Sequence, residues 1–546
     1  MSTVCHAADK SQNLEEKSWV PIGNSNEKYQ GTFDGNNKTI TNLYINASQL
    51  NVGLFGYTNE GTIKNLTFEY ANVTNTNNYV GVLVGKAFGG STLQNIKISN
   101  TCQIKGGKYT GGIAGYLDGN AYNCVNCAKV QGIQYIGGLC GYYSRISNSI
   151  NSMTACANYG NVTASSLGVG GLVGYFDSGT IQDCANYGDV KGTDRIAGMA
   201  GSVNNGKIQN VFSYGNISVT NKTQNVGMAF GYSYSGATEG MVAYYSGAKL
   251  TVNGQEQTVK AFGNGKPSED NATGFTEAQL RSGEVAYQLQ QNASNGAKWG
   301  QNLADSRDQY PVLGSDYKVV KAAQGDKDAN GNDTYWATFS NLTNDVTLSV
   351  PSDRTLKVYN ATVSGGKMTL TERNSQVAKD EGVLLKTDGE YVNAKANETN
   401  ELTKASSDEN HLVATPAEAQ TVTAETGCKL YRLTYKNATN KERLGFYLSV
   451  DKANNSSNGT SLKATPGKAY LQVSENEAKD PSSAALARSF VFGSGNETTG
   501  IDGITIMGTD VQRHGTIEGI FDLQGRKISN PTKGIYIKNN KKVVIK

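Results

Sequence analysis

Carboxylates that could catalyse sugar chemistry are few in the first half of the chain. Only eight acidic residues lie between residues 51 and 246, and four of them fall close together. These four are Asp177, Asp183, Asp189 and Asp194. Glycoside hydrolysis needs two carboxyl groups about 5 to 10 Å apart. A carbohydrate-active lyase or hydrolase is therefore one hypothesis for this segment, and a solvated acidic edge is the other.

Tyrosines recur at one position of a repeated pattern and are the best candidates for a binding surface. Each follows a glycine that closes a short apolar, glycine-rich segment. They are Tyr57, Tyr116, Tyr142, Tyr175 and Tyr232. Flat rings give a large contact area at low entropic cost, so a row of them suits an extended glycan or a protein strand. The same rings could instead stack on one another and brace the turns, and both interpretations stay open.

Metal-binding patterns are incomplete. Asp326, Asp328 and Asn330 copy the opening of a calcium loop, but the twelfth position is alanine where a bidentate glutamate is needed. An acidic hairpin tip is the favoured interpretation, with calcium as the alternative. Cys124 and Cys127 have a metal-like spacing, yet no second such pair follows. We predict neither a metal nor a cofactor.

Other chemistries find little support. The three histidines, His6, His411 and His514, do not stand beside a serine or cysteine nucleophile motif. The formal net charge is +3 and charged residues make up 18% of the chain, so no basic field is present to hold nucleic acid. No run of 18 apolar residues could span a bilayer. We predict no enzymatic activity and no nucleic-acid partner.

A glycine motif that recurs seven times positions these residues. Its closing glycines, which stand 26 to 33 residues apart, are Gly56, Gly85, Gly115, Gly141, Gly174, Gly201 and Gly231. A near-constant period of this length marks a solenoid, whose stacked units bury one continuous core. Short runs rich in Val, Ile, Tyr and Thr predict a parallel β-helix of about three strands per coil, with rungs about 4.8 Å apart.

Each coil carries a second motif, Gly-x-Ile-x-Asn followed by an apolar residue. Its polar members are Asn65, Asn95, Asn123, Asp183 and Asn210. Stacking predicts that these side chains bond one another and the turn backbone, so we interpret the row as structural. Cys124, Cys156 and Cys184 take core positions that other coils give to aliphatic residues, which predicts buried thiols. A disulfide between stacked cysteines is the alternative in an oxidising compartment.

Both ends of a solenoid need covering. Residues 19–46 predict one more, atypical coil at the first end, and an insertion near residues 145–154 interrupts the fourth repeat. At the other end, residues 274–293 predict a helix, with Thr276 as N-cap and Gln279 completing a capping box. We expect this segment to plug the last coil.

Many short alternating strands with polar turns follow, which predicts an antiparallel β-sandwich. The predicted fold is therefore all-β. We divide it into an N-terminal segment with a capping coil (1–50), the solenoid (51–250), a helical cap or linker (251–316), the β-sandwich (317–495) and a small C-terminal β-module (496–546).

Several of these segments carry a family resemblance. Residues 170–175, Gly-Gly-Leu-Val-Gly-Tyr, and their six counterparts resemble the GLUG motif of bacterial surface proteins, including those attached to some immunoglobulin-A-cleaving proteases. Together with residues 19–23 and 282–291, the tail FDLQGRKI (521–528) and PTKGIYIKNNKKVVIK (531–546) resembles secreted or surface proteins of Bacteroides and Prevotella type bacteria. The tail is similar to sorting domains recognised by type IX secretion, which implies contact with outer-membrane secretion machinery.

The start, MSTVCHAADK, lacks a secretory signal, so the chain is either truncated at its front or not exported. The resemblance favours truncation of an extracellular or outer-membrane surface protein. We therefore expect a non-enzymatic adhesion or interaction protein that presents a solenoid face to a glycan or to a host or bacterial surface protein. A carbohydrate-active enzyme and a passive surface stalk remain the alternatives.

Overall fold

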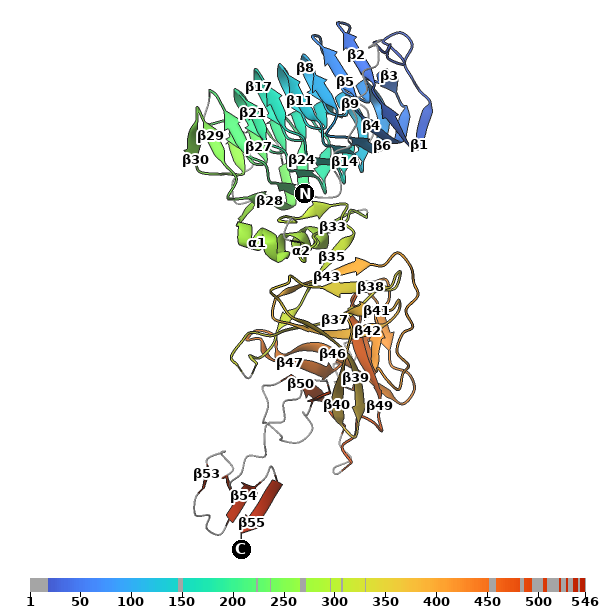
Figure 1. The fold of residues 1–546 in the computed structure, drawn as a ribbon, viewed down its shortest axis with the longest axis vertical. Coiled ribbons are helices and arrows are strands. Elements are labelled where there is room, and N and C mark those ends of the chain that lie inside the picture. The colour runs from blue at the N-terminus through green and yellow to red at the C-terminus, as the bar shows by residue number, and fades with distance from the viewer. Residues whose placement is uncertain are drawn as a thin grey trace.

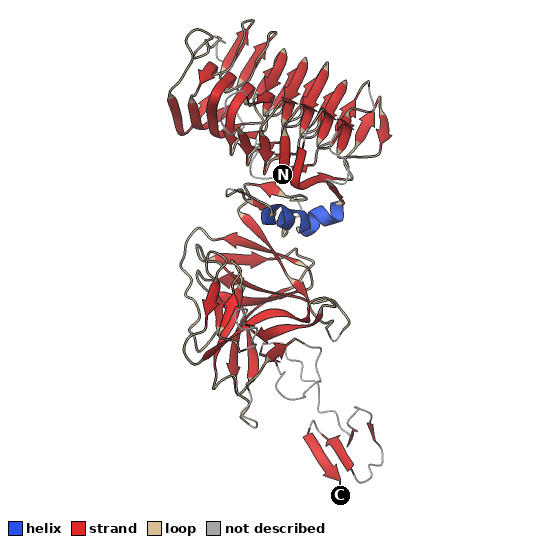
Figure 2. Ribbon diagram, turned by 180° about the vertical axis from the view of Figure 1, so that it is seen from behind, coloured by secondary structure: helices blue, strands red, loops and turns tan. Residues whose placement is uncertain are grey.

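The molecule is elongated and is built almost entirely of strands (Figures 1 and 2). The computed structural model describes residues 18–492, except 146–150, 222–223, 236, 266–271, 295, 306–307, 329, 451–457 and 482–485, together with five short strands between residues 504 and 545. A solenoid, a short helical segment and a stack of antiparallel sheets follow one another along the chain (Figure 1). This confirms the predicted all-β class.

The solenoid consists of three sheets that share one core. Sheet A has 18 strands: β1 (Thr32–Thr41), β3 (Phe55–Asn59), β4 (Thr62–Glu69), β6 (Val84–Ile98), β9 (Ala114–Tyr122), β10 (Val125–Asn126), β13 (Cys140–Ser144), β14 (Ser152–Thr154), β15 (Ala157–Asn158), β18 (Val173–Phe176), β19 (Thr180–Gln182), β20 (Ala185–Asn186), β23 (Ala200–Val203), β24 (Lys207–Ser213), β27 (Phe230–Ser233), β28 (Ala237–Tyr245), β31 (Phe262–Gly265) and β32 (Thr273–Phe275). Sheet B contains β2 (Tyr44–Ala47), β5 (Asn72–Asn75), β7 (Gln103–Lys105), β11 (Lys129–Gly132), β16 (Val162–Ala164), β21 (Val190–Gly192), β25 (Ile217–Val219), β29 (Leu250–Val252) and β30 (Gln255–Gln257). Sheet C contains β8 (Lys108–Gly111), β12 (Gln134–Gly137), β17 (Leu167–Gly170), β22 (Asp194–Ala197) and β26 (Val226–Gly227).

The register of these sheets follows the sequence repeat. Tyr116 pairs with Tyr142, and Tyr142 pairs with Tyr175, so equivalent positions lie one above another. A Cβ atom on any of the seven closing glycines would lie 2.3 to 2.5 Å from an atom of a neighbouring coil. Real Cβ contacts are longer, so only glycine fits there. The first coil is the predicted atypical one, because β1 and β2 pair with the strands of the next coil.

The asparagine row bonds as predicted. Asn95 Nδ2 donates to Asn65 Oδ1 at 2.7 Å, and Asn123 Nδ2 donates to Asn95 Oδ1 at 2.9 Å. Asn210 Nδ2 donates in the same way to Asp183 Oδ1. These residues have φ between 50° and 58°, a left-handed conformation that asparagine and aspartate tolerate better than most residues. The row therefore stabilises a corner that every coil repeats.

The described free cysteines are mostly core residues. Cys102, Cys124, Cys140, Cys156 and Cys184 are free and buried, and Cys428 is free and partly exposed. Cys124, Cys156 and Cys184 stack as predicted: the Cys124 backbone N–H donates to Cys156 Sγ at 3.4 Å, and that of Cys156 to Cys184 Sγ at 3.4 Å. Burial raises the pKa of Cys102 to about 11. These thiols therefore fill space in the core rather than forming disulfides with one another.

We expect Cys428 to be alkylated first among these six thiols when the native protein is treated with iodoacetamide. The other five should react at least about tenfold more slowly, because burial keeps them protonated and out of contact with solvent. Peptide mass spectrometry after short labelling times checks this, with Cys428→Ser as the control. Rapid labelling of Cys124 or Cys156 in the native protein would contradict the buried placement.

The helical segment lies against the side of the solenoid. It contains α1 (Glu277–Ser282), α2 (Glu284–Gln291), and the two-stranded sheet of β33 (Trp299–Gly300) and β34 (Val312–Leu313). Thr276 and Gln279 form the predicted capping box, and the helix breaks at Gly283, whose φ is 90°. Neither of these two helices, the ones found among the described residues, has the length or apolar character of a bilayer span.

The helical segment was expected to plug the open end of the last coil, but it packs against the side of the solenoid. Leu280, Leu289 and Trp299 pack with Ala185 and Phe212, which face outward from sheet A in successive coils. At this end of the solenoid, β30 turns back and pairs antiparallel with β29 of sheet B. An outer face with alanines and aromatic rings was available for burial, so the helices cover that flank (Figure 1).

Three antiparallel layers follow the cap. Sheet E is β35 (Tyr317–Lys321), β43 (Tyr391–Ala396), β38 (Val346–Ser349) and β41 (Gln376–Val377). Sheet F is β36 (Ala323–Gln324), β37 (Tyr335–Ser340), β42 (Gly382–Thr387), β39 (Leu356–Ser364), β40 (Lys367–Arg373) and β51 (Ile504–Met507), the last joined in parallel. Sheet G is β44 (Leu412–Ala414), β49 (Ala469–Ser474), β46 (Cys428–Asn437), β47 (Glu442–Leu448) and β50 (Ser489–Val491), and sheet H is β45 (Thr421–Thr423) with β48 (Ser461–Lys463).

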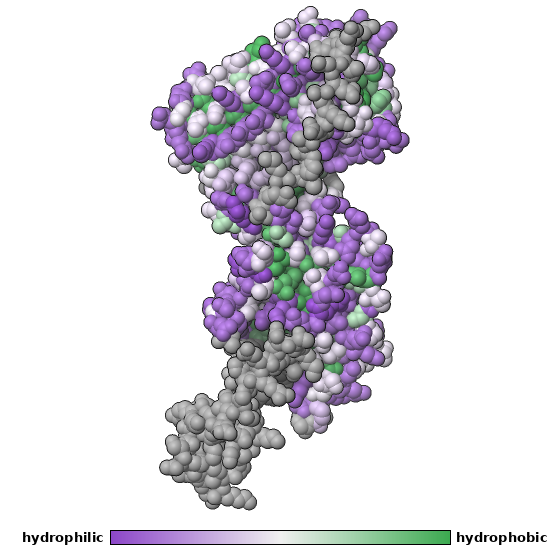
Figure 3. Space-filling view, viewed as in Figure 1, coloured by the Kyte–Doolittle hydropathy of each residue, from purple (hydrophilic) through white to green (hydrophobic). Residues whose placement is uncertain are grey.

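The segment predicted as a two-layer β-sandwich therefore has three layers, formed by sheets E, F and G. Sheet F is central and is apolar on both faces: Val383 and Leu385 of β42 pack toward sheet E, whereas Leu384 packs toward sheet G. On the face of the molecule shown in Figure 3, hydrophilic residues surround an apolar patch over the upper part of these sheets. Two hydrophobic cores therefore hold the three layers together.

The described part of the C-terminal module is a small antiparallel sheet. It contains β53 (Lys527–Ile528), β52 (Ile520–Phe521), β54 (Gly534–Lys538) and β55 (Lys541–Ile545). These strands fall within the predicted sorting-like tail. The residues between them lie outside the described ones, as do residues 1–17 and His514.

Candidate binding surface on the solenoid

The tyrosines predicted as a binding row do lie in one column of sheet A. The column runs Tyr57, Lys86, Tyr116, Tyr142, Tyr175, Ser202 and Tyr232. The Tyr116 and Tyr142 ring centroids are 5.1 Å apart at 14°, and those of Tyr142 and Tyr175 are 5.0 Å apart at 18°. Lys86 and Ser202 occupy the two coils that lack a tyrosine. The structure therefore brings the five predicted residues into one register, with direct stacking in the middle.

A second column of rings lies beside the first and was not predicted. Tyr79, Tyr109 and Tyr135 stack on one another at 5.1 and 5.5 Å. Each also meets the first-column ring of the following coil edge-on, as Tyr109 does with Tyr142 at 5.3 Å and 83°. We call the two columns together, with Lys86 and Arg195, the tyrosine strip.

The backbone of the second column is unusual for its side chains. Tyr79, Tyr109 and Tyr135 have φ of 62°, 60° and 55°, a left-handed conformation that costs a bulky residue about 1 to 2 kcal/mol. The next coil has Gly168 at this position, with φ of 80°. Three coils therefore carry a tyrosine where glycine would suit the backbone better. The aromatic side chains must offset that cost.

Positively charged side chains lie beside the tyrosine rings. The Lys86 Nζ atom lies 5.2 Å from the Tyr57 ring centroid and 5.0 Å from that of Tyr116. Lys108 Nζ lies 4.6 Å from the Tyr109 ring, and the Arg195 guanidinium lies 4.6 Å from the Tyr232 ring. Cation–π contacts of this kind are worth about 0.5 to 2 kcal/mol, depending on solvent exposure.

The pKa shifts of the tyrosines in the strip keep their rings neutral. Burial raises the pKa of Tyr79 and of Tyr175, so both phenols stay protonated at any physiological pH. Burial lowers the pKa of Lys86, with Lys28 nearby adding to the effect. A hydrogen bond with Tyr109 raises the pKa of Lys108. Besides the cations Lys86, Lys108 and Arg195, the carboxyl groups of Asp118 and Asp177 also lie close enough to act on the first-column rings.

This geometry decides which part of each ring a partner could touch. The faces of Tyr116, Tyr142 and Tyr175 are covered by neighbouring rings, and Tyr116 is only 6% exposed. Tyr57, Tyr142, Tyr175 and Tyr232 are partly exposed. Ring edges carry partial positive charge. The strip therefore offers phenol hydroxyls, positive ring edges and cations to an acidic, extended partner.

A second tyrosine row is fully used by the fold. Tyr159 and Tyr187 stack at 4.4 Å, and Tyr214 stacks on Tyr245 at 5.0 Å, beneath the cap. The Tyr187 hydroxyl donates to the Pro311 carbonyl oxygen at 2.9 Å. These tyrosines stabilise the contact between the solenoid and the cap. Of the tyrosine rows on sheet A, the tyrosine strip is therefore the one with room for a partner.

The four clustered aspartates each take part in local hydrogen bonds. Asp177 accepts from Asn204 Nδ2 at 3.0 Å, and Asp194 accepts from Asn225 Nδ2 at 2.8 Å. Asp189 accepts from the Asn216 backbone N–H at 2.8 Å. Asp183 is buried and accepts from Ser294. The structure thus uses all four carboxylates to fix turns or to hold the cap.

The calcium-like loop is an ordinary hairpin tip. Asp328 Oδ1 accepts from the backbone N–H groups of Asn330 and Asn332, at 2.9 and 2.8 Å. These bonds lower the pKa of Asp328. Asp326 contributes its backbone carbonyl, which accepts from the Thr334 hydroxyl at 2.7 Å. No group of three or more metal-ligating side chains occurs among the described residues.

The second column could have been found from a local signal. Tyr79, Tyr109 and Tyr135 each stand immediately before the β-branched residue that opens the glycine motif, at the same distance from the closing glycine. The signal is weak because other coils have Asn51, Gly168 and Arg195 at this position. Lys86 was missed because it replaces a tyrosine.

Comparisons with known proteins find similarity over parts of the chain. No family model matches it. Halomucin of Haloquadratum walsbyi is 40% identical over 177 residues, 30% of this chain and 2% of halomucin. A provisionally named Gly-rich membrane protein of Evansella cellulosilytica is 37% identical over 75 residues, 13% of this chain and 9% of that protein. A crystal structure of a provisionally named immunoglobulin A1 protease from Bacteroides ovatus overlaps 52% of this chain and 76% of its own, at 18% identity and a TM-score of 0.35. The chain therefore spans less than a tenth of the length of these two curated relatives, and its similarity to them is confined to segments.

Proposed function

We propose that this chain belongs to an exported or cell-surface protein without enzymatic activity, which binds an extended acidic glycan along the tyrosine strip. The observation that carries the proposal is the pair of ring columns that lie side by side, with Tyr79, Tyr109 and Tyr135 against Tyr116, Tyr142 and Tyr175 and cations beside them, at the rung spacing of about 4.8 Å. A polymer with regularly spaced negative groups matches such a surface. Each contact is weak, and repetition along the strip supplies the affinity.

The backbone of the second column supports a binding role. Stacking contributes about 0.5 to 1.5 kcal/mol per ring pair, which is close to the cost of the left-handed tyrosine conformation. Tyr79, Tyr109 and Tyr135 therefore keep a backbone conformation that costs free energy, although glycine would remove that cost. Residues held in costly conformations cluster at functional sites, which favours a partner over a purely structural role.

The absence of enzymatic activity is likewise part of the proposal. The four clustered aspartates, the only such group in the solenoid sequence, are each engaged in local hydrogen bonds. A surface location is supported by the two relatives, named halomucin and a Gly-rich membrane protein. The GLUG-like repeats and the sorting-like tail favour the same location and a type IX-like export route.

Replacing Tyr79, Tyr109 and Tyr135 together by glycine should weaken retention of polygalacturonate at least about tenfold, which corresponds to about 1.4 kcal/mol. Glycine suits the left-handed backbone, so folding should persist while the second column disappears. Affinity electrophoresis of the full chain in gels with polygalacturonate, chondroitin sulfate or neutral dextran measures this.

Tyr122→Ala is the matched control, because this exposed solenoid tyrosine lies outside the strip. The proposal predicts retention by the acidic polymers, little by dextran, and no shortening of any polymer. Equal retention of the triple variant would refute the strip as the binding surface. Shortening of a polymer would favour a carbohydrate-active enzyme. Retention only by a surface protein would indicate a protein partner in place of the glycan. Binding to none of these would favour the passive surface stalk.

A further inference from the structure

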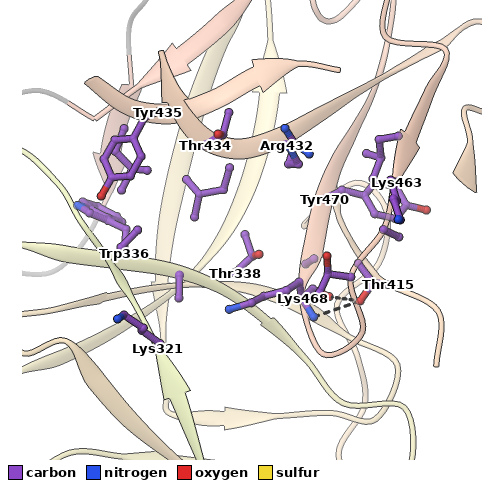
Figure 4. Close-up of a pocket in the computed structure, with 18 residues that line it drawn as sticks. Lys321, Trp336, Thr338, Thr415, Arg432, Thr434, Tyr435, Lys463, Lys468 and Tyr470 are labelled. Atoms are coloured by element: carbon purple, nitrogen blue, oxygen red, sulfur yellow. Dashed lines mark hydrogen bonds between the residues drawn. The ribbon is translucent and has the colours of Figure 1, made fainter. Parts of the chain in front are cut away.

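A basic pocket opens between two strands of sheet G. Strands β46 and β49 pair from Cys428 opposite Ser474 to Tyr431 opposite Leu471, and their pairing stops there. Beyond this point β46 stays with β47, and β49 stays with β44. The strands separate and leave a pocket of 330 Å³, lined below by β37 of sheet F and at the side by β48 (Figure 4).

All the charged side chains that line this pocket are positive. Its charged members are Lys321, Arg432, Lys463 and Lys468. Its hydroxyl donors are Thr338, Thr434 and Thr465, and none of the described lining residues is acidic. The Thr415 hydroxyl also lines the pocket but already donates to the Lys468 carbonyl oxygen at 2.9 Å. In Figure 4 the Lys468 side chain extends toward Thr338 and Lys321, so its amine points across the pocket. Several donors therefore converge on one small space.

The charges of these residues are largely uncompensated within the protein. Lys321 pairs with Glu390 at 2.9 Å. Among the described residues, no ion pair joins Arg432, Lys463 or Lys468 to a carboxylate. Burial and the neighbouring Lys318 lower the pKa of Lys468. Both effects disfavour the charged amine, and an anion beside it would relieve them.

Two of the three aromatic residues that line the pocket, Trp336 and Tyr435, already have partners within the protein. The Trp336 ring stacks on Phe492 at 4.1 Å and 3°, with Lys386 Nζ lying 5.2 Å from its centroid. The Tyr435 hydroxyl donates to the Gln324 carbonyl oxygen at 2.7 Å. Of the lining rings only that of Tyr470, which is 9% exposed, is left for stacking on a ligand. The free capacity of the pocket is positive charge and hydroxyl donors.

We propose that this pocket binds an oxyanion group, a carboxylate, sulfate or phosphate, on a ligand about the size of one sugar ring. The volume lies at the small end of the range for ligand sites, about 300 to 1,000 Å³. Charge-assisted hydrogen bonds to Lys468 and Arg432 hold the anion, and the threonine hydroxyls orient the rest of the ligand. The site is separate from the tyrosine strip and does not depend on it.

Calorimetric titration of the full chain with glucuronate, inorganic sulfate and glucose tests this site. Glucuronate or sulfate should bind and glucose should not. Lys468→Met should raise the dissociation constant about tenfold, because one charged hydrogen bond is worth about 1.5 to 3 kcal/mol. Arg432→Met is the second variant, since this residue is exposed and its replacement leaves folding intact. Lys404→Met, an exposed lysine that does not line the pocket, is the matched control.

Tighter binding of glucuronate than sulfate supports a saccharide-borne carboxylate, whereas equal binding supports the oxyanion alone as the recognised group. Binding of glucose as strong as glucuronate, no binding of either anion, or unchanged affinity in both Lys468→Met and Arg432→Met would overturn the site. The triple glycine variant of the strip should bind glucuronate normally, which separates this site from the proposed function.

Discussion

Gly174→Ala is expected to destabilise the solenoid by about 3 kcal/mol or more, at the upper end for overpacking. The added Cβ would lie 2.3 Å from the Tyr135 carbonyl carbon and 2.4 Å from the Ile136 nitrogen, both backbone atoms of the preceding coil. Neither atom can move without parting two coils whose strands pair on both sides of the contact. Because each coil is stabilised only by its neighbours, loss of one interface weakens the whole stack.

Thermal and urea unfolding of the full chain, followed by far-ultraviolet circular dichroism, measures this change. Gly389→Ala is the matched control: its Cβ would meet nothing closer than 3.7 Å, and it lies in the antiparallel sheets. We expect the control to unfold like the parent protein. A Gly174→Ala protein with an unchanged solenoid transition would mean that the coils are not stacked in this register.

The features that sequence reasoning predicted well are those written into a local period. The closing glycines predicted the register of all three solenoid sheets, because a fixed repeat places equivalent residues on adjacent rungs. The capping box at Thr276 and the strands of sheets F and G followed from short motifs and from alternation. Even the cysteine row was predicted, since Cys124 and Cys184 stand where other coils have leucine or isoleucine.

The features that were not predicted depend on which distant surfaces meet. Nothing near residue 280 indicates that the helices pack on Ala185 and Phe212 rather than on the open end of the last coil. The third layer had a weak signal, because Gly-Val-Leu-Leu in β42 is apolar at consecutive positions, as strands buried on both faces are. The basic pocket had none, since it exists only where β46 and β49 separate.

One departure from the asparagine row is explained by the cap. In the first coils each amide donates to the one before it, as Asn95 does to Asn65. Asp183 has no such acceptor, because the preceding coil carries Ala155 at this position. Its second oxygen instead accepts from the Ser294 backbone N–H at 3.0 Å and from the Ser294 hydroxyl at 2.6 Å. The other oxygen accepts from Asn210 Nδ2, so both oxygens act as acceptors. An amide has only one acceptor atom, which is why aspartate replaces asparagine here.

Asp183→Asn should therefore destabilise the joint between cap and solenoid by about 3 kcal/mol, although it restores the residue type of the row. Asp183 is fully buried. If the oxygen of the new amide faces Asn210, its NH₂ group faces the two donors of Ser294. If the amide is flipped, its NH₂ group faces the NH₂ group of Asn210 instead. Two charge-assisted hydrogen bonds are lost, each worth about 1.5 to 3 kcal/mol. In addition, at least one buried donor is left without an acceptor.

Hydrogen exchange of α1 and α2 in the full chain, read by mass spectrometry, detects the loosened cap. Asn123→Asp makes the reverse exchange at an exposed member of the same row, and we expect it to leave exchange in the helices unchanged. Faster exchange in α2 of Asp183→Asn, with protection of the antiparallel sheets retained, is the expected pattern. Identical exchange in both variants would show that Asp183 does not hold the cap, and the aspartate would then have to be explained by the solenoid alone.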